Sequence, residues 1–130
     1  MEVDEVVLAS LQGKAIDVLR RHVEAINSGD KHSAMQNLVA AEAFPSAAEI
    51  YWEKALGLRP LVLSGMVAQR PRFRVRNGES EMRVFVEGHV GSPSCKPIPF
   101  GFSVLLHLER PSARIAGRLP VHELKSSVKV

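Results

Sequence analysis

The first half of the chain carries hydrophobic residues at helical spacing. From residue 4 to residue 26 they recur every three or four positions, at Val7, Leu8, Leu11, Ala15, Leu19, Val23 and Ile26. This spacing places them along one face of an α-helix. The sequence Asn27-Ser28-Gly29-Asp30 predicts a stop and a restart, because Gly29 can adopt the left-handed C-cap conformation and Asp30 can N-cap a second helix. We expect that second helix to reach about residue 41, and a third to follow the capping box Ser46-Ala47-Ala48-Glu49 as far as Gly57.

The second half alternates between apolar and polar residues, as half-buried strands do. Residues 61–66 predict a short strand or an extended link, and residues 69–76, 82–90, 100–109 and 113–119 predict strands. Asn77-Gly78 is the preferred two-residue hairpin turn, and residues 91–99 predict a proline-rich loop. Pro120 is expected to end the sheet, leaving residues 121–130 as a frayed tail. The positions expected to face inward are Phe73, Val75, Met82, Val84, Val86, Phe102, Val104, Leu106, Leu108 and Ile115.

Helices followed by an antiparallel meander predict an α+β fold. The long first helix can bury its apolar stripe only by lying across the apolar face of the sheet. At 130 residues the chain fits a single domain, residues 1–130, with a core over about residues 5–120.

Charge is divided unequally between the two halves. Residues 1–60 hold six Lys/Arg and nine Asp/Glu, a net charge of −3. Residues 61–130 hold eleven Lys/Arg and five Asp/Glu, a net charge of +6, so the two halves add up to the formal charge of +3. No apolar run approaches the roughly 20 residues that a helix needs to span a bilayer. We therefore do not expect this chain to be a membrane protein. The acidic start of the chain and the single cysteine, Cys95, predict a cytoplasmic protein without disulfides.

The ordered motifs resemble those of the nuclear transport factor 2-like superfamily over about residues 5–120. Members often carry an A-x-N-x-G-D element, seen here as Ala25-Ile26-Asn27-Ser28-Gly29-Asp30. They often close with W-R-I-x-G, and here Ala113-Arg114-Ile115-Ala116-Gly117 lacks the tryptophan. The resemblance implies three N-terminal helices packed on a curved antiparallel sheet, a cone around an apolar pocket, and a homodimer formed through the outer face of the sheet. Because the superfamily includes isomerases, cyclases, dehydratases, ligand-binding proteins and structural modules, it does not settle function.

Catalysis in such a cone needs ionisable groups that face the pocket. The resemblance implies a general base after the second helix, where residues 39–45 offer no aspartate and Glu42 is the nearby acid. The expected inward stripe contains no residue that titrates, which argues against acid/base chemistry. A bulge could reverse the register and turn Ser103, His107 and Glu109 inward. His107 with Glu109 is then a second candidate base, although a histidine on the outer face is the commoner case.

Two hypotheses about function remain open. In the first, the pocket binds a hydrophobic small molecule without catalysis, or is filled by side chains. In the second, the protein is an isomerase, lyase or cyclase for a hydrophobic carbonyl compound, with Glu42 or His107 as base and Tyr51 polarising the substrate. Both use the same expected pocket walls, Tyr51, Trp52, Phe73, Met82 and Phe102.

Basic residues line one face of a predicted strand, at Arg70, Arg72, Arg74 and Arg76. Nucleic-acid binding is disfavoured, because no aromatic residues alternate with them to stack bases. We expect a solvated or dimer-facing surface, with Leu105 as the apolar residue on that face. No His/Asp/Glu grouping has metal-ligand spacing, so neither a metal nor another cofactor is expected.

Overall fold

The long first helix forms as the sequence predicts. A computed structural model describes residues 4–107 and 113–125. In it α1 spans Glu5–Ser28, and the Asp4 side chain caps the helix by accepting a hydrogen bond from the Val6 N–H at 3.0 Å. Gly29 ends the helix with a φ of 76°. That left-handed conformation is open to glycine at little cost, so the predicted C-cap is confirmed.

The expected second helix is broken in two, and the prediction of one helix to residue 41 is wrong. Its parts are α2 (Lys31–Gln36) and α3 (Val39–Ala43). Between them Leu38 forms an isolated parallel bridge with Ile115, and the Ile115 N–H donates to the Asn37 carbonyl at 2.6 Å. A contact with a residue far along the chain therefore interrupts a segment whose local sequence favours helix.

The last long helix begins one residue earlier than its expected cap. α4 spans Pro45–Leu58, with Phe44 at the N-cap position and no side-chain hydrogen bond there. The predicted capping box at Ser46 is therefore wrong. Proline suits the first helical position because it has no N–H to satisfy and its φ is already helical.

The strands form one antiparallel sheet. They are β1 (Val62–Ala68), β2 (Arg72–Arg76), β3 (Glu79–Ser92), β4 (Cys95–His107) and β5 (Ala113–Ala116). The order is β1-β3-β4-β5, and β2 also pairs with β3, beside the part of that strand that β1 leaves open. Asn77 and Gly78 have φ values of 51° and 78°, so the predicted two-residue hairpin turn is confirmed.

The proline-rich segment is mostly strand, which corrects the expected loop over residues 91–99. β3 continues to Ser92 and β4 starts at Cys95, so Pro97 and Pro99 lie within a strand. β5 pairs with β4 only from Ser103 to Leu106. The first half of β4 therefore has one open edge, where proline removes no ladder hydrogen bond.

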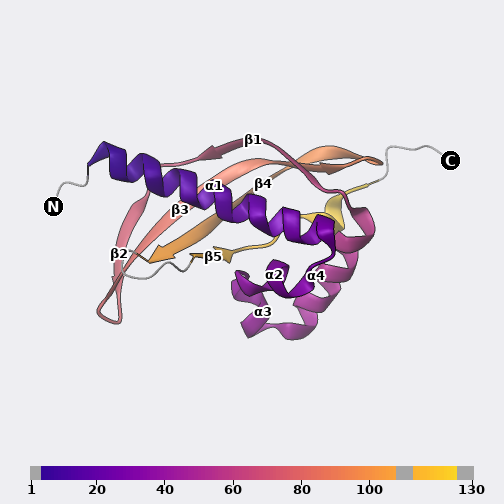
Figure 1. The fold of residues 1–130 in the computed structure, drawn as a ribbon, viewed down its shortest axis with the longest axis horizontal. Helices are drawn as coiled ribbons and strands as arrows, with labels where there is room; N and C mark the ends of the chain where they lie inside the picture. Colours follow the sequence, from indigo (N-terminus) through magenta and orange to yellow (C-terminus); the bar gives the residue numbers. More distant parts are fainter. Residues whose placement is uncertain (1–3, 108–112, 126–130) are drawn as a thin grey trace.

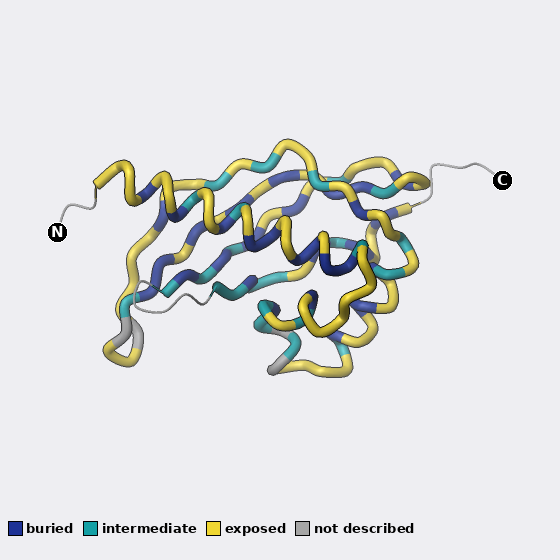
Figure 2. The backbone as a smooth tube through the Cα atoms, viewed as in Figure 1, coloured by how far each residue is buried: buried dark blue, intermediate teal, exposed yellow. Residues whose placement is uncertain are grey.

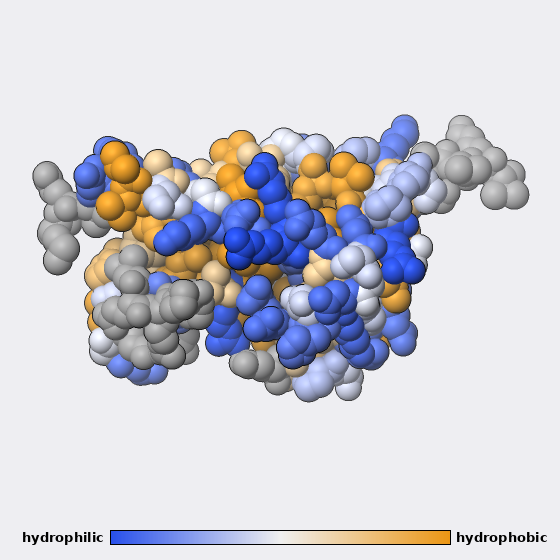
Figure 3. Space-filling model, in the orientation of Figure 1, coloured by the Kyte–Doolittle hydropathy of each residue, from blue (hydrophilic) through white to orange (hydrophobic). Residues whose placement is uncertain are grey.

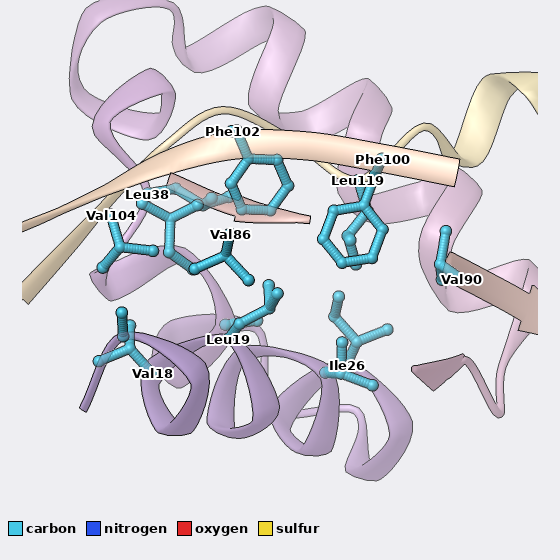
Figure 4. Packing of buried hydrophobic residues seen from close by; sticks show 14 of the residues in the cluster. Val18, Leu19, Ile26, Leu38, Val86, Val90, Phe100, Phe102, Val104 and Leu119 are labelled. Atoms are coloured by element: carbon cyan, nitrogen blue, oxygen red, sulfur yellow. The ribbon is translucent and has the colours of Figure 1, made fainter. Parts of the chain in front are cut away.

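Helix α1 lies across the inner face of this sheet, and the remaining helices gather at one end (Figure 1). The side of α1 that meets the sheet is buried and its other side is exposed (Figure 2). Val18, Leu19 and Ile26 of α1 point toward Val86, Phe100 and Phe102 of the sheet (Figure 4). The fold class is α+β, with helices packed on a curved five-stranded antiparallel sheet.

The C-terminal segment contributes to the core rather than fraying from residue 121. A short 3₁₀ helix, Val121–Glu123, follows β5 and packs against α4. Leu119, Val121 and Leu124 are buried, and residues 126–130 of the expected tail lie outside the described part.

Candidate functional site

The register of β3 with its neighbours decides which side chains face α1. Met82 lies opposite Phe73 of β2 and Leu106 of β4, so the three share the inner face. From the Val75–Ser80 pair to the Val90–Ile98 pair, the inner positions carry apolar residues, with Ser80 as the polar exception. Those apolar positions on β3 and β4 are Met82, Val84, Val86, Gly88, Val90, Ile98, Phe100, Phe102, Val104 and Leu106. This part of the inner face therefore carries no side chain that titrates.

Burial along that inner face is uneven. Met82 and Phe102 are buried, as expected, whereas Phe73 is 56% and Val75 61% exposed. Their expected burial is wrong because α1 packs on β1, β3, β4 and β5, while the β2–β3 hairpin extends away from it (Figure 1).

Other apolar side chains are exposed at the same end of the molecule. Val6 and Val7, in the first turn of α1, are 74% and 45% exposed. Figure 3, seen from the side of α1, shows hydrophobic surface where α1 begins. Glu5 ties this turn to the β1–β2 connection, because its Oε1 lies 3.3 Å from Nη1 of Arg70. We call Val6, Val7, Phe73 and Val75 the open-end patch.

The two candidate bases do not meet on the inner face. His107 lies opposite Glu81 on the outer face, and the β3–β4 register runs unbroken from that pair to Val90 and Ile98. No bulge in this stretch turns Ser103 or His107 inward. Glu42 belongs to α3, but its side chain lies outside the described part of the structure, as does Glu109. The catalytic role of either candidate base stays a prediction.

A buried polar pair joins α1 to α4. The Nε2 atom of His22 lies 2.8 Å from the Tyr51 hydroxyl oxygen, and its Nδ1 lies 2.8 Å from the Ala34 carbonyl oxygen. A carbonyl can only accept, so Nδ1 carries the proton, and in a neutral imidazole Nε2 accepts from the Tyr51 hydroxyl. The Leu119 N–H donates to that hydroxyl in turn. Four segments of the chain are thus tied together inside the core.

Burial sets the protonation of both members of the pair. It lowers the pKa of His22 to about 4, against a smaller opposing effect of the hydrogen bond to Ala34. It also raises the pKa of Tyr51 above its ordinary value, chiefly because the charged phenolate is poorly solvated there. Both side chains are therefore neutral near pH 7.

Two of the residues expected to line the pocket, Tyr51 and Trp52, lie in or next to this buried pair. Tyr51 is fully buried with its hydroxyl bonded to His22, and Trp52 is 6% exposed. The role of either side chain as a ligand contact stays a prediction. Helical spacing does not predict the partnership of Tyr51 with His22. The available signal is that His22 falls on the α1 stripe between Leu19 and Ile26, where a histidine needs a buried hydrogen-bond partner.

The outer face of the sheet holds a buried acid, Glu81. Glu81 is 7% exposed between Arg74 and His107, and its Oε1 has no hydrogen-bond partner among the described residues. Leu105 lies between Arg83 and Arg114 on the same face, half-buried. Dimerisation through this face stays a prediction.

The described surface includes three depressions. One, of about 380 Å³, lies between α1 and β1 beside Val23 and Leu61, and another, of about 600 Å³, lies by Lys31 and Met35. A third, of about 270 Å³, lies on the outer face of the sheet. In the described part of the chain, no group of three or more His, Cys, Asp or Glu is placed to hold a metal ion, and no helix has the length and apolar character to cross a membrane.

Comparison with known proteins gives a likeness to solved structures but not to any family model. No family model matches the chain, and no curated protein matches it. The solved structures that resemble it include a protein of Xanthomonas campestris pv. campestris provisionally named a polyketide cyclase, with 12% identity and a TM-score of 0.37. The match covers 81% of this chain and 89% of that chain. The architecture described above rests on this chain's own strand register and helix packing.

Proposed function

We propose that the protein is a cone-fold member of the nuclear transport factor 2-like superfamily that binds a hydrophobic small molecule at the open-end patch. The observation that carries this proposal is the exposure of Phe73 and Val75 on the inner face of the sheet. The same face is buried under α1 elsewhere, so these two side chains continue a core surface out to where a ligand can reach it. Exposed apolar surface of this kind commonly marks a binding site.

The chemistry of the patch suits an apolar ligand. Met82 and Leu106 adjoin Phe73 on the inner face, and Ser80, opposite Val75, supplies a hydroxyl that can orient one polar group. Small-molecule sites combine a mainly apolar lining with few polar groups in this way.

The alternative, an isomerase, lyase or cyclase for a hydrophobic carbonyl compound, needs a general base within reach of the ligand. The described inner positions on β3 and β4 carry none, and the Tyr51 hydroxyl is bonded to His22. That alternative therefore depends on Glu42, and binding without catalysis is the function better supported.

The first experiment is native mass spectrometry of the purified protein, followed by solvent extraction and identification of any co-purifying compound. An apolar compound bound at one per chain would support the proposal and give the ligand's structure.

A titration with an uncharged fluorescent probe, N-phenyl-1-naphthylamine, then locates the site. An uncharged probe is chosen because the arginines of the outer face would attract an anionic one. We expect the double variant Phe73→Ser, Val75→Ser to bind the probe about fivefold more weakly, from the apolar contact it loses.

Phe44→Ser is the matched control. Phe44 is 67% exposed at the start of α4, away from the patch, so its replacement removes the same kind of side chain from elsewhere. The proposal fails if this control weakens probe binding as much as the double variant, or if the double variant binds like the unchanged protein.

A further inference from the structure

The chain leaves a depression on the outer face of the sheet where it passes from β1 to β2. Both strands pair with β3, and Gln69 keeps the connection against β3 by donating its N–H to the Phe85 carbonyl at 2.8 Å. The depression has a volume of about 270 Å³. Its lining residues come from the connection, β2, β3 and β4: Gln69, Arg70, Arg72, Arg83, Phe85 and Ser103. It lies on the opposite face of the sheet from the buried core.

Two positive charges in this depression form no ion pair with any residue that the structure describes. Arg72 and Arg83 are directly opposite each other on β2 and β3, an arrangement of like charges that is unfavourable by itself. Arg70 forms an ion pair with Glu5, whereas neither Arg72 nor Arg83 forms one within the described residues. Two acids lie on the same face of β3: Glu87 accepts a hydrogen bond from the Gln69 side chain, and Glu81, opposite Arg74, forms no ion pair among the described residues. Within the described residues, the guanidinium groups of Arg72 and Arg83 are therefore available to an anionic ligand.

An aromatic ring adjoins these charges. Phe85 is 37% exposed, and its ring lies against the backbone of Gly101. A Cβ at Gly101 would come within 2.7 Å of the Phe85 Cζ atom, so glycine is what lets the ring lie this close to β4. Ser103, directly opposite Phe85, places a hydroxyl on the same face.

We propose that this depression binds a small organic phosphate that carries a planar ring, with a nucleoside monophosphate as the model ligand. A phosphate monoester carries close to two negative charges near pH 7, which matches the two unpaired guanidinium groups. Those groups donate in a planar fork that fits phosphate oxygens, and Ser103 adds a hydroxyl donor. The ring of the ligand packs on Phe85.

The size and composition of the site favour a small ligand over a nucleic-acid strand. Its volume lies just below the roughly 300 Å³ at which small-molecule pockets begin. Strand-binding surfaces stack successive bases on several aromatic rings. Among the described residues that line this depression, Phe85 is the one aromatic side chain.

Isothermal titration with adenosine 5′-monophosphate tests the proposal, with adenosine and inorganic phosphate as partial ligands. We expect the monophosphate to bind at least about tenfold more tightly than either part, because each part makes one of the two contacts. Arg83→Gln and Arg72→Gln should each weaken monophosphate binding about tenfold, the scale of a lost charge-assisted hydrogen bond. Phe85→Leu should weaken the monophosphate but leave inorganic phosphate unchanged.

Arg21→Gln is the matched control for net charge. Arg21 is an exposed arginine on α1 that pairs with Asp17, and its loss should leave binding unchanged. Equal weakening by Arg21→Gln and Arg83→Gln would overturn the proposal, since binding would then reflect overall charge. Equal affinity for adenosine and the monophosphate would overturn it as well.

Two further outcomes decide against a small-molecule site. A single-stranded oligonucleotide that binds far more tightly per chain than the monophosphate would make this a nucleic-acid surface instead. Light scattering during the titration shows whether the predicted dimer is present. This matters because a dimer formed through this face would bury Phe85. Dissociation of such a dimer by the monophosphate supports the site, and a dimer that the monophosphate leaves intact overturns it. The titration with the apolar probe concerns the other face of the sheet. Failure of one proposal therefore leaves the other unaffected.

Discussion

Acidification should destabilise the protein through His22. The imidazole is 2% exposed and bonded to Tyr51 and Ala34, and its burial lowers its pKa from 6.5 to about 4. In the unfolded chain the same imidazole takes up a proton below about pH 6.5. The unfolded state therefore binds more protons between those two values, and the free energy of unfolding falls as the pH drops through that window.

The size of the effect follows from the shift. One pKa unit corresponds to about 1.4 kcal/mol, so the shift of His22 costs about 3 kcal/mol once the pH is below both values. Between about pH 7 and pH 4.5 the expected loss is about 2 kcal/mol. Above about pH 7 this residue should contribute no pH dependence, because the imidazole is neutral in both states.

Urea unfolding followed by the fluorescence of Trp52, the single tryptophan, measures this loss. Carboxylates also titrate in this range, so the variant His22→Gln is the reference. Its amide can donate to the Ala34 carbonyl and accept from the Tyr51 hydroxyl, but it does not titrate. We expect the stability difference between the two proteins to change by about 2 kcal/mol in favour of the variant from pH 7 to pH 4.5. A difference that stays constant over this range would refute the buried, neutral state of His22.

Three further predictions concern other contacts. Tyr51→Phe should lower the free energy of unfolding at pH 7 by about 1–3 kcal/mol, because it leaves Nε2 of His22 buried without a donor, and an unchanged urea midpoint would contradict this. Gly117→Ala should lower the free energy of unfolding by about 1–3 kcal/mol in the same assay, because the new Cβ would lie 2.5 Å from the Cβ of Phe102. A variant as stable as the original would show that the backbone at the end of β5 shifts without cost. Leu105→Glu should convert a dimer formed through the sheet face to monomer in size-exclusion chromatography with light scattering, while unchanged elution would exclude that interface.

Elements governed by neighbours in sequence could be predicted from the sequence. The stripe of α1, its Gly29 cap and the Asn77-Gly78 hairpin all depend on contacts within a few residues. Capping and turn chemistry act over that range, so the local sequence is sufficient. The α+β class follows from the same patterns, because an apolar stripe and an apolar sheet face must cover each other.

Other features depend on residues that are distant in the chain. Leu38 breaks a helix because Ile115 of β5 lies beside it, and Pro97 fits in a strand because β5 leaves that edge of β4 open. The buried state of Val121 likewise depends on α4, against which its short helix packs.

The candidate sites show the same division. Alternation identified Phe73 as an inner-face residue, but its exposure depends on how far the β2–β3 hairpin extends beyond α1. His22 and Tyr51 each lie on the apolar stripe of a helix that the sequence predicts. Their hydrogen bond, however, depends on where α1 and α4 pack against each other. Periodicity assigns a side chain to a face of its own element. Only the packing of that element against the others decides whether the side chain is covered, which polar group it meets, and which charge is left without a partner.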